Sequence, residues 1–362
     1  MRNKIDRTLL IITILLVIFG LFMVYSASNV VALYKYKDSF YFIKRQLLFA
    51  IIGFFTMFII IKTNNKYFYK YTNLIFFIVF LLLIIVLLPG VGMVRGGARS
   101  WIGVGSFSVQ PAEFMKLALI MFLSKYLSKH ESDLNKFKNF IYILIIIFLM
   151  FGLIMLQPDF GTGIVLVISC FLLLFYSGAP IKYFVFLISL GIGGIILLIA
   201  SAPYRIERIL AFLDPWSDPL GSGFQTIQSL YAISPSGLFG LGYNNSMQKH
   251  FFLPEPQNDF IFAIVCEELG LIGGLILLVL FILLIYRIIY IGKNITNNYH
   301  KYLCFGIALI YFTQIFINIG VVIGLLPVTG ITLPIISYGG SSLVLSLAMV
   351  AIVLNISKEV EV

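Results

Sequence analysis

Residues 260–285 read FIFAIVCEELGLIGGLILLVLFILLI, and only two side chains in this run, Glu267 and Glu268, are charged. A helix needs about 20 mainly apolar residues to cross the hydrocarbon core of a bilayer. The run therefore predicts a transmembrane helix. Because ionisable groups are costly inside a membrane, the two glutamates also need a reason to be there.

Comparable apolar runs recur along the whole chain. They lie at residues 8–25, 40–61, 72–88, 111–127, 140–156, 163–177, 181–200, 260–285, 302–326 and 335–356. The chain is 60% hydrophobic and 11% charged, against about 45–50% and about 25% in soluble domains. This composition excludes a cytosolic enzyme, a secreted domain and a coiled coil. The sequence predicts an all-α polytopic integral membrane protein with about ten transmembrane helices, forming a single domain over residues 1–362.

The basic residues predict an orientation. The net charge is +10, which in a soluble protein would suggest a nucleic-acid partner. Here Lys and Arg are about threefold denser in one alternate set of loops, the set that includes both termini. Basic loops stay in the cytoplasm, so both termini are expected to be cytoplasmic and nucleic acid is not expected as a partner. The three cysteines and three histidines show no metal or redox spacing.

One outer loop, at about residues 201–258 between the seventh and eighth helices, is much longer than the others. Loops of this length are usually functional or disordered. This loop contains Trp216 and Tyr243, and the stretch 225–233 has helix-like apolar spacing. We expect one or two short amphipathic helices here, lying at the outer membrane interface.

Four charged residues fall at one predicted level, the outer membrane face. They are Glu113, Lys116, Asp159 and Asp259. Each has a purely structural interpretation: the first two as an ion pair, and each aspartate as a helix N-cap. Unrelated caps and pairs need not share one level, whereas the residues of a site would. Glu267 and Glu268 are more simply explained by pairing with neighbouring helices.

Two arginines, Arg95 and Arg99, lie in the glycine-rich stretch 95–105. Guanidinium groups suit bidentate phosphate binding, although this loop could merely anchor Trp101 at the interface. Two classes of function fit these charges. A transporter would place them in broken helices near the bilayer midplane, and a membrane enzyme acting on a lipid-linked substrate would place them at the interface. The long outer loop and the outer position of the charges favour the enzyme.

Several motifs together resemble the SEDS proteins, the shape, elongation, division and sporulation family. The motifs that carry the resemblance are Gly97–Gly103 (GARSWIG), Gln110–Lys116 (QPAEFMK), Gln157–Thr162 (QPDFGT), Leu253–Ala263 (LPEPQNDFIFA), Glu267–Gly270 (EELG) and Asn318–Ser342. They follow one another over nearly the whole chain. Within the family, residues 212–219 (FLDPWSDP) and 245–249 (NSMQK) are more similar to the FtsW/SpoVE branch than to the RodA branch.

The resemblance implies a peptidoglycan glycosyltransferase that acts in cell division or in synthesis of the sporulation septum. Such proteins polymerise lipid II, an undecaprenyl-pyrophosphoryl disaccharide-pentapeptide, at the outer face of the bacterial cytoplasmic membrane. They work with a class B penicillin-binding protein transpeptidase and with other divisome or elongation proteins. The family's essential acidic residue maps to Asp259. Glu113, Lys116 and Asp159 map to positions that the family also treats as important. A lipid II flippase is the alternative function.

The expected chemistry is glycosyl transfer with inversion. Asp259 is the expected base for the attacking hydroxyl, and an inverting reaction needs no covalent intermediate. Lys116, Arg95 and Arg99 are the expected cations for the leaving pyrophosphate. A divalent cation, Mg²⁺ or Mn²⁺, held by carboxylates stays open as a cofactor, but the sequence contains no dedicated metal motif.

Overall fold

The computed structural model describes residues 4–95, 97–104, 107–130, 134, 136–200, 212–221 and 223–360. Long helices form at each of the ten expected positions: α1 (Arg7–Tyr36), α2 (Tyr41–Lys62), α3 (Lys66–Ile85), α4 (Pro111–Lys129), α5 (Phe137–Met155), α6 (Phe160–Tyr176), α7 (Ile181–Ala200), α10 (Ile261–Lys293), α11 (Asn298–Val322) and α12 (Gly340–Ile356). Among the described residues, seven helices are long and apolar enough to cross a membrane, and α6 is a shorter apolar helix. The prediction of an all-α polytopic membrane protein is therefore confirmed.

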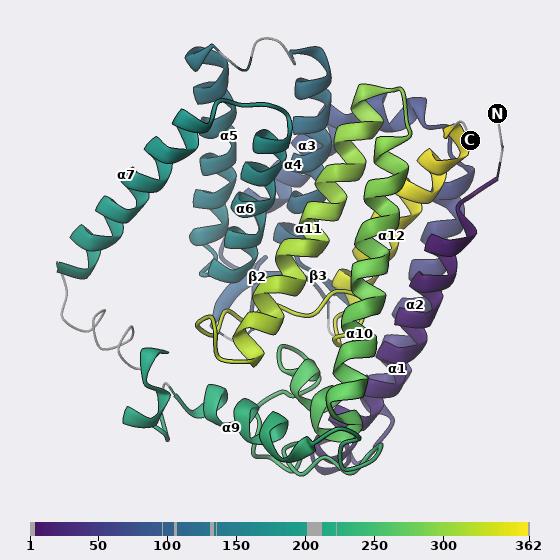
Figure 1. The fold of residues 1–362 in the computed structure, drawn as a ribbon, viewed down its shortest axis with the longest axis vertical. Coiled ribbons are helices and arrows are strands. Elements are labelled where there is room, and N and C mark those ends of the chain that lie inside the picture. The colour runs from purple at the N-terminus through teal and green to yellow at the C-terminus, as the bar shows by residue number, and fades with distance from the viewer. Residues whose placement is uncertain are drawn as a thin grey trace.

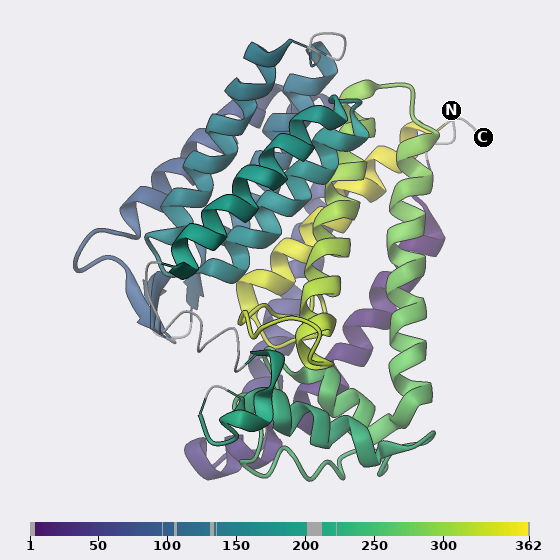
Figure 2. The same cartoon turned by 60° about the vertical axis from the view of Figure 1, so that its left-hand side comes forward.

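The helices form a bundle with α11 and α12 near its centre (Figures 1 and 2). α11 contacts α4, α6 and α10, while α12 packs mainly against α2. The outer helices expose apolar side chains where they would meet lipid, for example Ile51 and Phe55 of α2. By contrast, α11 is buried over most of its length.

Both chain ends lie at one end of the bundle (Figure 1). The backbone N–H of Asp6 donates to Ser357 Oγ at 3.0 Å. The Asp6 side chain caps α1 and forms an ion pair with Arg287 of α10. The short connection between α10 and α11 lies at the same end.

The opposite end carries two features. The first is a small sheet between α3 and α4, with β1 (Met93–Arg95), β2 (Ala98–Val104) and β3 (Phe107–Val109) in antiparallel order β1-β2-β3. The sequence predicts only a glycine-rich loop here. Stretches of three to seven residues are too short to show strand periodicity when glycines interrupt them.

The second feature is the long connection before α10. It contains η2 (Pro215–Ser217), α9 (Phe224–Ile233) and η3 (Ser234–Ser236), and α9 lies across the end of the bundle (Figures 1 and 2). Ser229 Oγ of α9 donates to the carbonyl oxygen of Val322 at 2.6 Å, which ties α9 to the end of α11. A short helix over residues 225–233 is thus confirmed. Residues 201–211 and 222 of the predicted loop lie outside the described residues.

The largest differences from the predicted extents are in α1 and α10. α1 continues to Tyr36, well beyond residue 25, because its buried hydroxyls have partners: Ser26 donates to the Glu268 carboxylate, and Ser28 donates to the Val24 carbonyl of α1 itself. α10 is interrupted at Gly270, whose φ of 67° and ψ of −166° are not helical. Residues 237–242 lie against this break. There Leu241 N–H donates to the Glu267 carbonyl, and Leu271 N–H donates to the Gly237 carbonyl.

Candidate active site

Asp259 lies two residues before α10 and is half-buried. Its backbone carbonyl accepts a hydrogen bond of 2.7 Å from Asn318 Nδ2 of α11, which also donates to the carbonyl of Ile331. Gly330 packs beside the carboxylate, since a Cβ built on this glycine would lie 3.7 Å from Asp259 Oδ2. The backbone of Asp259 is therefore held firmly between α11 and the segment that precedes α12.

The Asp259 carboxylate is left available for chemistry. The N-cap of α10 is Phe260, with no capping side chain, so the interpretation of Asp259 as a helix cap is wrong. Within the described part of the chain, no hydrogen bond or ion pair involves its carboxylate oxygens. Burial, together with the nearby negative charge of Glu255, raises the pKa of Asp259 to about 6.

Asp159 caps α6 and also contacts α4. One carboxylate oxygen accepts from Thr162 N–H at 3.2 Å, and the other accepts from the side-chain amide of Gln110. The cap interpretation is thus correct, but it describes only half of the contacts. Burial raises the pKa of Asp159, and the nearby Glu113 carboxylate adds to this effect.

The start of α6 also packs on the segment that holds Asp259. A Cβ at Gly161 would lie 2.5 Å from the carbonyl oxygen of Thr329, so only glycine allows this close approach. Asp159, two residues before Gly161, and Asp259, beside Gly330, therefore lie next to the same short segment.

Glu113 and Lys116 form a buried ion pair one turn into α4. Lys116 Nζ is 2.7 Å from Glu113 Oε1, and the lysine side chain is 2% exposed. The same Nζ donates to Gln314 Oε1 of α11 at 2.9 Å, and Gln314 Nε2 donates to the carbonyl of Thr332 at 3.0 Å. The pair thus reaches the segment that carries Gly330.

Residues 329–332 consequently link the four predicted charged residues, which come from α4, from the start of α6 and from the approach to α10. Gln314 and Asn318 donate to this segment, and Gln110 joins Asp159 to the start of α4; none of the three was a predicted site residue. Gln314 and Asn318 are four residues apart in an otherwise apolar helix. This spacing, which places two amides on one helix face, was a usable signal.

The two arginines of the glycine-rich stretch lie in the small sheet. Arg95 ends β1 opposite Ala98, and its side chain lies outside the described residues. Arg99 in β2 is half-exposed and pairs with Val94, with its stem against Gly92. Among the described contacts, none joins Arg99 directly to Asp259, although β2 does contact α4.

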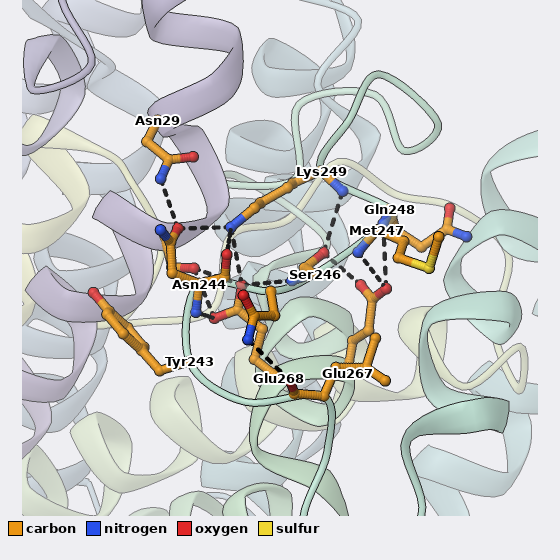
Figure 3. Close-up of polar contacts among 12 residues, drawn as sticks. Asn29, Tyr243, Asn244, Ser246, Met247, Gln248, Lys249, Glu267 and Glu268 are labelled. Carbon is orange, nitrogen blue, oxygen red and sulfur yellow. Dashed lines mark hydrogen bonds and ion pairs between the residues drawn. The ribbon is translucent and has the colours of Figure 1, made fainter.

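Glu267 and Glu268 hold the long connection before α10 onto this helix (Figure 3). The Glu268 carboxylate accepts from Ser26 Oγ, from Asn244 N–H at 2.9 Å and from Ser246 N–H at 3.2 Å. It also lies 3.3 Å from the buried Lys249 ammonium. The expected pairing with neighbouring helices is found only at Ser26 of α1, because most partners of the two glutamates lie in this loop.

Glu267 completes the attachment from the other side. Its carboxylate accepts from Ser246 Oγ and from Met247 N–H at 2.8 Å (Figure 3). Residues 243–249 lead directly into the stretch that ends at Asp259, and the Leu253 N–H donates to the Gln248 carbonyl. The two glutamates therefore position the chain that carries Asp259.

Metal ligation has little support from side-chain clustering. Among the residues that the structure describes, no three His, Cys, Asp or Glu side chains converge on one point. Asp259 and Asp159 are the carboxylates that could share a divalent cation with substrate phosphates, since Mg²⁺ is commonly bound in this way.

Comparison with known proteins fits this arrangement. A family profile described as cell cycle protein, FtsW/RodA/SpoVE, matches residues 6–362. The chain belongs to this family. It is 55% identical to stage V sporulation protein E of Bacillus subtilis, covering 98% of this chain and 97% of that protein. It is 41% identical to a probable peptidoglycan glycosyltransferase FtsW of Coxiella burnetii, over 98% of this chain and 97% of the relative. The predicted SEDS membership, in the FtsW/SpoVE-like branch, is confirmed.

Two solved structures share the fold. A chain from work on structural coordination of polymerization and crosslinking by a peptidoglycan synthase complex matches with a TM-score of 0.80 and 29% identity, over 98% of this chain and 97% of that one. The rod shape determining protein RodA of Thermus thermophilus matches with a TM-score of 0.74 and 24% identity, over 99% and 98%. The second likeness shows the fold alone.

Proposed function

We propose that this multi-pass membrane protein is a peptidoglycan glycosyltransferase that polymerises lipid II into glycan strands for the division or sporulation septum. Its ten helices and the long outer connection form one SEDS domain over residues 1–362. Relatives named for peptidoglycan glycosyltransferase activity and for sporulation support this function. The observation that carries the site assignment is the half-buried Asp259 carboxylate, firmly held through its backbone and unpaired within the described residues.

The proposed reaction is a direct displacement at the anomeric carbon of one lipid-linked sugar. The attacking hydroxyl of a second lipid-linked sugar transfers its proton to Asp259 as the new glycosidic bond forms. The bond to the diphosphate lipid breaks, and the diphosphate leaves with the electron pair. A base works best when its pKa is near the operating pH. A pKa of about 6 for Asp259 meets this requirement.

We assign the buried Glu113–Lys116 pair a structural role beside the site. Lys116 is already engaged by Glu113 and Gln314, so its charge is largely neutralised before substrate arrives. We assign the pair the role of fixing Gln314 against Thr332, and so of shaping the segment beside Asp259. Arg99 and Arg95 remain the proposed phosphate-binding cations of the sheet.

The proposed partner is a class B penicillin-binding protein that crosslinks the new strand. A solved relative belongs to a peptidoglycan synthase complex that couples polymerization with crosslinking. The proposed location is the bacterial cytoplasmic membrane, with both termini in the cytoplasm and Asp259 on the outer side. Cysteines at the exposed positions Leu220, just before α9, and Thr296, between α10 and α11, test this orientation, because these two connections lie at opposite ends of the bundle (Figure 1). In intact cells, an impermeant thiol reagent should label only the cysteine at 220.

Polymerisation of labelled lipid II by the purified chain, with and without a cognate class B penicillin-binding protein whose transpeptidase is inactivated, tests the function. A glycan ladder is expected with the partner present. A flippase would instead move lipid II between leaflets and give no ladder with the inactivated partner. That outcome would replace the proposed function by the alternative.

A further inference from the structure

One arginine outside the predicted site is held next to the Asp259 loop. Arg45 lies in the first turns of α2 and is half-buried. Its Cζ lies 3.9 Å from the ring centroid of Tyr41, and this ring stacks on Tyr36 at 3.6 Å with an interplanar angle of 5°. Such a cation–π contact fixes the guanidinium on a rigid aromatic support.

The same arginine reaches the segment before α12. Its positive charge acts on the hydroxyl of Tyr338. The backbone N–H of Tyr338 donates to the carbonyl of Gln257 at 2.9 Å, and Gln257 is two residues before Asp259. Arg45 is therefore one side chain removed from the loop that carries the proposed base.

The neighbouring residue locks this arrangement in place. Gln46 is buried, with its Nε2 donating to the Ser337 carbonyl at 3.0 Å and its Oε1 accepting from Gly339 N–H at 3.2 Å. Both ends of one amide thus attach α2 to the turn around Tyr338. Arg45 consequently has a fixed position relative to that turn.

The charge of Arg45 is not neutralised within the described part of the chain. The ion pairs found there involve other cations, including the adjacent Lys44, which pairs with Asp38 at 2.8 Å. A guanidinium offers five N–H donors, and a ring below it leaves most of them free. A fixed, partly desolvated cation without a carboxylate partner is suited to an anion supplied from outside.

The lipid side of α2 suits an anion that carries a long apolar chain. Leu48, Ile52 and Phe55 follow Arg45 at helical spacing and are exposed. A prenyl chain could lie along these side chains, with its phosphates level with Arg45 at the end of the helix. A soluble phosphate compound has no apolar chain that could contact these side chains.

We propose that Arg45 binds the diphosphate of the lipid-linked substrate; this inference rests on the proposed glycosyltransferase function and adds to it a cation that the sequence did not single out. In this arrangement Arg45 approaches the diphosphate from α2, while Asp259 faces the sugar. Lys116, already paired with Glu113, is not needed as a phosphate ligand.

The test measures binding of undecaprenyl diphosphate and of lipid II to the full chain in nanodiscs. Arg45→Gln should weaken binding of both ligands by about 10–100-fold, as expected for loss of charged hydrogen bonds. It should raise the KM for lipid II more than it lowers kcat. Lys44→Gln, which removes the neighbouring exposed cation, should change neither. Unchanged affinity of Arg45→Gln for undecaprenyl diphosphate would overturn the proposal, and so would a loss confined to lipid II.

A structural role for Arg45 is distinguished by two further variants. Tyr338→Phe removes the hydroxyl that the charge of Arg45 acts on but keeps the cation, so diphosphate affinity should persist; an equal loss in this variant would contradict the proposal. Arg45→Lys keeps the charge and should bind the diphosphate less tightly than wild type. This variant replaces Arg45→Gln in the test if Arg45→Gln does not fold. Unchanged diphosphate affinity of Arg45→Lys would then refute the assignment. Failure of the proposed function would show separately, as absence of polymer from the wild type.

Discussion

Removing the carboxylate of Glu268 should release the loop before α10 without unfolding the bundle. Glu268 is fully buried and accepts hydrogen bonds from Ser26, from Asn244 and from Ser246, besides its ion pair with Lys249. In Glu268→Gln the amide nitrogen must face at least one of these donors. The Lys249 ammonium, whose side chain is 2% exposed, loses its carboxylate.

The expected cost follows from this burial. Breaking a buried ion pair by removing one partner typically costs about 3–5 kcal/mol, and burial already lowers the pKa of Lys249, so its charge is poorly solvated. Stability of a domain is about 5–15 kcal/mol. We therefore expect loss of the loop attachment, not global unfolding.

Limited proteolysis of the loop and thermal unfolding in detergent measure this effect. Glu268→Gln should make residues 237–258 rapidly cleavable, while Glu255→Gln, an exposed carboxylate in the same loop, should behave like wild type in this assay. Lys249→Met in the Glu268→Gln background should recover part of the lost stability, because it removes the unpaired ammonium. Additive effects of the two changes, or normal protease resistance in Glu268→Gln, would refute the reasoning.

Two further predictions concern the site itself. Because the pKa of Asp259 is raised to about 6 and the base must be ionised, kcat/KM should fall as pH drops through about 6; Glu255→Gln removes a charge that raises this pKa, so the fall should move to lower pH. If kcat/KM of Glu255→Gln falls at the same pH as in wild type, the charge of Glu255 does not act on Asp259. Exchanging the charges of Glu113 and Lys116 keeps an ion pair but turns the amide of Gln314 away from Thr332. Polymerisation should therefore drop at least about tenfold in a folded protein. Normal polymer yield would show that the direction of the ion pair does not matter for activity.

The helices were predictable because lipid imposes a simple rule on sequence. Each span must satisfy its backbone internally and present apolar side chains, so all ten runs were visible as hydropathy alone. The break of α10 at Gly270 was not visible, since it depends on backbone bonds from residues 237–242. The small sheet around Arg99 was not predicted either, because its strands are too short to show alternation.

The charged residues of the site were found because charge is conspicuous in apolar helices. Their supporting amides were harder to find. The spacing of Gln314 and Asn318 places them on one helix face, but only the structure shows that they donate to residues 331 and 332. Arg45 was counted only as an orientation charge, since nothing in the sequence places Tyr338 beside it.

Polymerisation by Asp259→Asn, assayed with the partner whose transpeptidase is inactivated, tests the central claim most directly. The amide keeps the size of the side chain but cannot take the proton. General-base catalysis contributes about 10²–10⁴-fold, so glycan synthesis should fall by that order, with thermal stability and partner binding unchanged. Asp214→Asn, which changes the exposed N-cap of η2, should polymerise normally. Near-normal polymerisation by Asp259→Asn would contradict the account.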